Sequence, residues 1–135
     1  MHRLRMFAGG AALAGGMALV VACGGSSSSS TSPSGPCTPS SDPRTIVIMN
    51  GAVCPQSLTV ARGSQVTMIN SDSRVHEMDS DPHPEHTDCP ELNQIGFVNP
   101  GQTRSSGNLN TARRCGFHDH GIPDSASLKG TITIQ

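Results

Sequence analysis

Short segments of strand-forming residues, each closed by a turn, dominate the chain from Arg44 to its C-terminus. The first of them, residues 45–49, is mostly β-branched and ends at the turn pair Asn50-Gly51. No window in this region carries the period of an amphipathic helix. Several short strands separated by turns indicate a β-sandwich, so we predict an all-β fold. The other segments that we expect to be extended are residues 57–61, 65–70, 74–78, 94–98, 102–109, 112–115 and 128–135.

The core of this sandwich is predicted to be aliphatic, because the 135-residue chain contains three Phe and no Tyr or Trp. A domain of about 90 residues can fold alone but buries little surface, so we expect reinforcement by disulfides or metal. The formal net charge of -1 and the lack of aromatic platforms argue against nucleic-acid binding. The residues expected in the core are Ile46, Ile48, Leu58, Val60, Val66, Met68, Ile132 and Ile134.

The N-terminal residues have the composition of a targeting segment. Arg3 and Arg5 precede an apolar stretch too short for a confident membrane span. The small residues before Cys23 resemble a bacterial lipobox, which implies cleavage before Cys23, its lipidation, and an anchor on the outer face of a bacterial membrane. The alternative is an ordinary secretory signal with a chance cysteine. The predicted divisions are a signal peptide at 1–22, a Ser/Gly/Pro-rich tether at 23–43 and a folded domain at 44–135.

Several segments of the folded domain, in their order, resemble parts of the cupredoxin family. Residues 58–70 are similar to its opening strand pair, and Asn99-Pro100-Gly101 to the turn before its penultimate hairpin. Cys115-Gly-Phe-His118 and the C-terminal strand resemble its Cys-x-x-His loop and last strand. The resemblance covers nearly all of the domain. It implies a Greek-key sandwich with one copper ion at one end, and an electron-transfer or copper-binding protein rather than an enzyme.

The same resemblance implies that His76, Cys115 and His118 are copper ligands. Imidazole accommodates both oxidation states of copper, and a thiolate binds it with strong covalency. The axial Met of the family is missing, because Leu128 stands at its position and no Met follows Cys115. His120 and Met78 are the candidate substitutes, and a site with His120 is closer to the more tetragonal copper types.

The cysteines allow a competing interpretation. Apart from Cys23 the chain has four cysteines, which in an oxidising compartment can form two disulfides in three ways. One pairing joins Cys37 to Cys54 and Cys89 to Cys115. It would leave no thiolate for copper, and both interpretations of Cys115 remain open at this point.

The histidines after the predicted signal peptide all lie between positions 76 and 120. In a cupredoxin-like fold the loop after His76 lies near the same end of the domain as the Cys115–His120 loop, so His83, His86, His118 and His120 are expected to converge. The functional interpretation is a site for Cu(II) or Zn(II), and the alternative is that His83 and His86 are solvated loop residues. Seven of the ten acidic residues fall between positions 72 and 91, where they could attract cations or a basic redox partner.

Two further functions compete with a copper-binding protein that passes electrons or copper to a partner protein. Residues 116–121 resemble the Gly-Phe-His-x-His segment of copper–zinc superoxide dismutases, but the further ligands that this family places downstream are missing. A metal-free, disulfide-stabilised binding or structural module of the cell envelope is the other alternative. No Ser-His-Asp arrangement, phosphate loop or nucleotide fingerprint is present.

Overall fold

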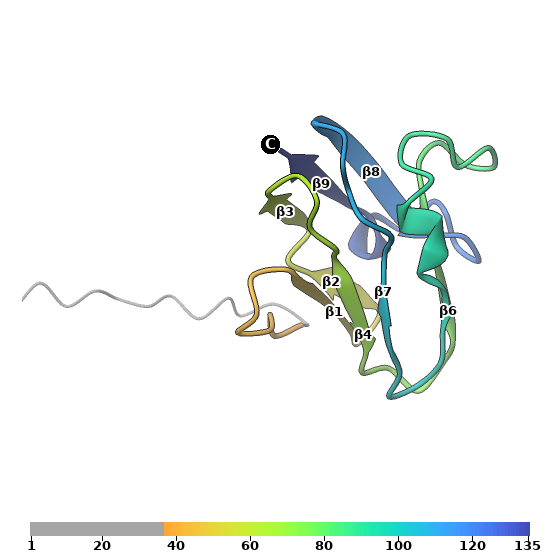
Figure 1. Ribbon diagram of the computed structural model, residues 1–135. Coiled ribbons are helices and arrows are strands. Elements are labelled where there is room, and N and C mark those ends of the chain that lie inside the picture. Colours follow the sequence, from red (N-terminus) through yellow and green to blue (C-terminus); the bar gives the residue numbers. More distant parts are fainter. Residues whose placement is uncertain (1–36) are drawn as a thin grey trace, which may run out of the picture. The chain divides into compact units, whose positions relative to one another are not determined.

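A computed structural model describes residues 37–135, which form two β-sheets around one apolar core (Figure 1). The four-stranded sheet has the order β2-β1-β4-β7, with β1 Thr45–Met49, β2 Ala52–Cys54, β4 Thr67–Asn70 and β7 Thr103–Ser105. The five-stranded sheet has the order β3-β9-β8-β5-β6, with β3 Ser57–Val60, β5 His76–Ser80, β6 Gly96–Val98, β8 Arg113–Asp119 and β9 Gly130–Ile134. Two 3-10 turns, η1 Leu92–Gln94 and η2 Ala126–Leu128, lie in the connections.

The predicted all-β sandwich is confirmed. Asn50 and Gly51 both have positive φ and close the hairpin between β1 and β2, as the turn pair predicted. Both sheets are mixed, because β1 pairs in parallel with β4 and β3 in parallel with β9. In the part of the chain that is described, no helix is long and apolar enough to cross a membrane. The predicted signal segment, Cys23 and most of the predicted tether lie outside the described residues.

The aliphatic core is also confirmed, since all eight residues expected in it are buried in one cluster. Phe117, the largest fully buried side chain, packs in the same cluster. Gly130 faces Phe117 across the pair β8–β9, where a Cβ would overlap the Phe117 ring and the Gln56 carbonyl. A glycine is therefore required at the start of β9.

The alternation of β5 and β8 decides which side chains can meet on the outer face of the five-stranded sheet. Cys115, Phe117 and Met78 belong to the core cluster and therefore point inward. Asp79 and His118 are directly paired in the register between the two strands and point to the opposite face. The outer face of this sheet, not the end of the sandwich, thus carries His118.

Residues 81–91, the histidine loop, connect β5 to η1 and fold back onto β8. The backbone N–H of Asp81 donates to the Gly116 carbonyl at 3.0 Å. The Asn93 side chain accepts from the Ser80 N–H and donates to the His86 carbonyl, both at 2.8 Å. The Cys89–Cys115 disulfide and an ion pair between Arg113 and Glu91 fasten the end of the loop. The loop is consequently held at both ends and at His86.

Candidate metal site

Four imidazole rings converge beside the outer face of the five-stranded sheet. His83 and His86 come from the histidine loop, His118 from β8, and His120 follows directly after β8. One ring nitrogen from each of the four lies within 4.8 Å of those of the other three. The ring centroids of His83 and His86 are each 4.9 Å from that of His120. These four residues, called the imidazole cluster below, are the histidines that the sequence predicted to converge.

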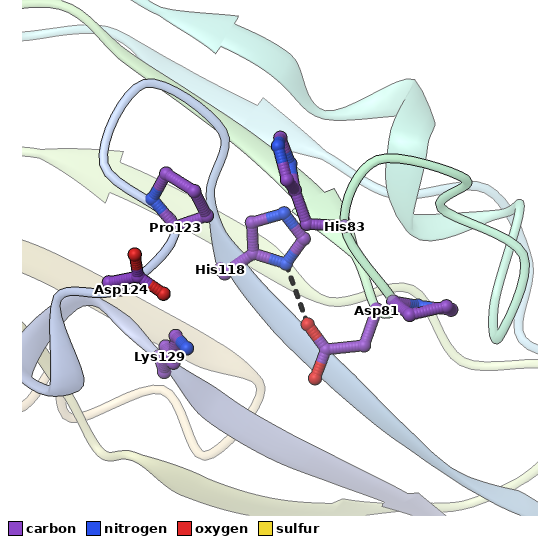
Figure 2. A pocket seen from close by; sticks show the side chains of 7 residues that line it. Asp81, His83, His118, Pro123, Asp124 and Lys129 are labelled. Atoms are coloured by element: carbon purple, nitrogen blue, oxygen red, sulfur yellow. Dashed lines mark hydrogen bonds and ion pairs between the residues drawn. The ribbon is translucent and has the colours of Figure 1, made fainter.

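One ring nitrogen of His118 is hydrogen-bonded, and the other has no hydrogen-bond partner among the described residues. Its Nδ1 lies 2.6 Å from Oδ1 of Asp81 (Figure 2), a contact that requires the N–H on Nδ1 and, in the neutral ring, leaves the lone pair on Nε2. Nε2 is buried and has no hydrogen-bond partner among the described residues. A buried acceptor without a partner is costly, and a metal ion would satisfy it. A carboxylate behind a ligating histidine is the usual arrangement at metal sites.

Gly116 makes room for that carboxylate. A Cβ built on Gly116 would overlap the carboxylate of Asp81, and the Asp81 Cβ would lie at 3.0 Å from it. Gly116 and His118 are two residues apart on one strand, so they share the outer face. The Asp81 side chain therefore lies across Gly116 to reach the His118 ring.

A second carboxylate, that of Asp79, lies beside the rings of His86 and His120. Nδ1 of His120 and Nε2 of His86 are 3.3 Å apart. Oδ2 of Asp79 lies 3.8 Å from Nδ1 of each of these histidines, and Asp79 is only 8% exposed. Glu77, Asp79 and His120 form a further group whose donor atoms meet the same distance limit. The donor atoms gathered here are imidazole nitrogens and carboxylate oxygens, which suit divalent ions.

His76 does not join the imidazole cluster, contrary to the role that the family resemblance implied. It begins β5 on the core-facing side and is 1% exposed. Both of its nitrogens are engaged, Nδ1 with Oδ2 of Asp119 at 2.6 Å and Nε2 with Oδ2 of Asp72 at 3.1 Å. Burial raises the pKa of Asp72, but hydrogen bonds from the Gly51 N–H and from His76 outweigh it and hold the pKa below its usual value. The His76 ring is therefore part of a buried hydrogen-bond network.

Cys115 and Met78 are also absent from the cluster. Cys115 is buried and bonded to Cys89, and Cys37 is bonded to Cys54, so the structure has the disulfide pairing that the sequence left open. The predicted thiolate ligand is therefore wrong for this state of the protein. Met78 is 1% exposed in the core cluster, because its position in β5 points inward. Among residues 37–135, no sulfur atom joins the candidate site.

Sequence reasoning missed the two carboxylates, Asp79 and Asp81, that contact the cluster. In the sequence they belong to the acidic residues of positions 72–91, for which no contact with the histidines was predicted. The position of Asp79 in the strand was the available signal. Asp79 is three residues after His76, so its side chain points to the other face of β5. Asp81 directly precedes Pro82-His83, at the point where the histidine loop leaves the sheet.

No protein-family model matches the chain, and no curated protein matches its sequence. Solved structures do match. A variant of amicyanin in its Cu(I) form has 18% identity and a TM-score of 0.53, over 67% of this chain and 80% of that one. A purple cupredoxin from Nitrosopumilus maritimus has 19% identity and a TM-score of 0.51, over 67% and 98%. Oxidised plastocyanin from Dryopteris crassirhizoma has 19% identity and a TM-score of 0.52, over 67% and 99%. The described residues thus form a cupredoxin-like domain.

Proposed function

We propose that this protein binds one copper ion, as Cu(II), at the imidazole cluster and serves in copper handling. The observation that carries the proposal is the buried, unpartnered Nε2 of His118 among three further imidazoles. His83, His86, His118 and His120 would hold the ion, while Asp81 orients the His118 ring. A bound copper ion supplies one-electron redox chemistry and an acceptor for oxygen or nitrogen donors.

The donor atoms favour copper handling over rapid electron transfer. The structures similar in fold include a variant of amicyanin in its Cu(I) form, which makes copper a reasonable metal for this fold. Among divalent first-row ions, a given nitrogen or oxygen site generally binds Cu(II) most tightly, and Ni(II) and Zn(II) bind less tightly. A sulfur donor, which stabilises Cu(I), is absent from the cluster. We infer that Cu(II) is the preferred state and that the protein holds or passes on the metal.

The proposed place of this activity is the bacterial cell envelope. The lipobox-like segment before Cys23 supports a lipid anchor at the membrane, and the two disulfides agree with an oxidising compartment. A redox or copper-delivery protein of the same compartment would be the partner. The acidic residues between positions 72 and 91 would attract cations to the site or complement a basic partner surface.

The direct test is a titration of the purified full-length protein with Cu(II) against a competing chelator. We expect one ion per chain, nitrogen hyperfine structure in the electron paramagnetic resonance spectrum and no intense thiolate-to-copper absorption band. His118→Ala should weaken Cu(II) binding by more than about 100-fold, beyond the usual loss for an outer-shell partner. Glu85→Gln, an exposed loop residue between His83 and His86, is the matched control and should bind like the wild type.

Three results would contradict the proposal. Wild-type Cu(II) affinity in His118→Ala would show that the metal binds at another site. An intense thiolate-to-copper band would restore Cys115 as a ligand. Absence of stoichiometric binding would favour the metal-free module, whose two predicted disulfides are both present. Superoxide-dependent activity of the loaded protein, above that of free copper, would support the dismutase alternative.

A further inference from the structure

A cavity of about 590 Å³ lies directly beside the imidazole cluster. Two of the four rings, His83 and His118, form part of its wall, and the His118 ring stands between His83 and Asp81 (Figure 2). Its volume is within the range of about 300–1,000 Å³ that is typical of small-molecule sites. The lining residues are Asp81, Pro82, His83, His118, Pro123, Asp124 and Lys129.

Of the charged side chains that line this cavity, one has a hydrogen-bond partner and two have no ion-pair partner among the described residues. The Asp81 carboxylate contacts Nδ1 of His118 through one of its oxygens, so part of its charge is already balanced by this hydrogen bond. Asp124 and Lys129 line the other side of the cavity (Figure 2), and neither makes an ion pair within 4.0 Å among the described residues. Lys129 is the only lysine of the chain. The cavity wall opposite His83 therefore carries one lysine ammonium and one aspartate carboxylate that have no ion-pair partner among the described residues.

We propose that this cavity admits a small anion that binds to the held metal ion from the side of His83 and His118. The inference rests on the proposed function, because a divalent ion supplies most of the positive charge. Lys129 attracts the anion and Asp124 opposes it, so the two residues tune its affinity without touching the metal ligands. Pro82 and Pro123 fix the backbone on two sides of the cavity, which keeps the entrance preformed.

The chemical class of ligand is a small anion with a lone pair, such as a halide, a pseudohalide or a short carboxylate. Such an anion would donate that lone pair to a bound ion, with no electron transferred and no covalent bond of the protein changed. A site of this kind differs from a closed electron-transfer site, because an outside ligand reaches the metal. It would let a small carboxylate compete for the ion during loading or release.

Azide is the probe that tests the inference. The Cu(II)-loaded full-length protein is titrated with azide, and the azide-to-copper absorption band reports binding. Lys129→Gln should weaken azide binding by roughly fivefold and Asp124→Asn should strengthen it by a similar factor, the effect of one partly screened charge. Lys129→Arg should restore the affinity. Arg114→Gln removes the same charge outside the cavity lining, and its azide affinity should stay that of the wild type.

The outcomes separate this inference from the proposed function. A protein that binds one Cu(II) but shows no azide band overturns the inference and leaves the function standing. Equal azide affinities in Lys129→Gln, Asp124→Asn and the wild type overturn the role of this cavity. Failure to bind Cu(II) at all overturns both proposals. A change of Cu(II) affinity in Lys129→Gln would show that Lys129 acts on the metal site itself, which also contradicts the proposal.

Discussion

Gly116 controls where the carboxylate that orients His118 can stand. The Asp81 side chain occupies the space that a Cβ at this position would take. The ring of His118 in turn takes its orientation from the 2.6 Å contact with Asp81. One missing methyl group on the outer face of β8 is therefore connected to the proposed metal through two side chains.

Gly116→Ala should displace Asp81 and leave Nδ1 of His118 without its partner. We expect Cu(II) affinity to fall by about 10- to 100-fold, as for loss of an outer-shell carboxylate. Competition titration measures the change. Gly107→Ala is the matched control, because the atoms nearest to its added Cβ belong to the amide end of the flexible Gln94 side chain. Wild-type affinity in Gly116→Ala would mean that Asp81 does not orient the ligand.

At this scale the sequence predicted the convergence of the histidines but not the fate of Cys115 and His76. The family pattern places Cys115 and His118 in one loop, whereas here β8 continues as a strand to Asp119. A spacing of three within a strand puts the two side chains on opposite faces. Cys115 therefore reaches Cys89 in the core, and His118 reaches the histidine loop. Strand length, which motif spacing does not specify, decided the outcome.

Among the elements, the histidine loop is joined covalently to β8 by one disulfide. Cys89–Cys115 connects the loop that supplies His83 and His86 to the strand that supplies His118. Cys37–Cys54 instead fastens the beginning of the described chain to β2. The two crosslinks close segments of similar length, with separations of 26 and 17 residues. Removing each disulfide in turn therefore tests whether a loss of stability alone changes the affinity for Cu(II).

Replacing both Cys89 and Cys115 with Ser should cost about 2–4 kcal/mol of stability and also weaken Cu(II) binding. Replacing both Cys37 and Cys54 with Ser should cost a comparable amount of stability and leave Cu(II) affinity unchanged. Denaturant unfolding measures the first quantity and chelator competition the second. Equal metal affinities in the two double variants would show that the other contacts of the loop are sufficient to hold it.

The strands with a strong hydrophobic pattern were predicted within about two residues, an error typical of element boundaries. Thr45–Met49 was predicted without error. The three-residue strand Ala52–Cys54 was missed, because a strand of this length beside Pro55 has no measurable alternation. β8 was predicted to end at Cys115, and its extension to Asp119 depends on pairing with β5. Such pairing is a tertiary property that local patterns do not contain.

For the whole molecule, the proposed lipid anchor on Cys23 would determine the cellular location of the metal site. Cys23→Ser should move the protein from the membrane fraction to the soluble fraction of the cell envelope and abolish incorporation of labelled fatty acid. Ser26→Ala, in the same predicted tether, is the control and should remain with the membrane. Membrane association of Cys23→Ser at the wild-type level would contradict a lipid anchor on this cysteine.

The position of β9 has a consequence for how the protein folds. Among the described strands, β3 pairs only with β9 in its sheet, and β9 also pairs with β8, so this sheet cannot form completely until residues 130–134 are available. Most of its contacts are distant in sequence, and high contact order slows folding. The five-stranded sheet therefore cannot form completely before residues 130–134 have been synthesised. A chain exported as proposed would cross the membrane before this sheet forms, and it would acquire its disulfides and the proposed metal afterwards.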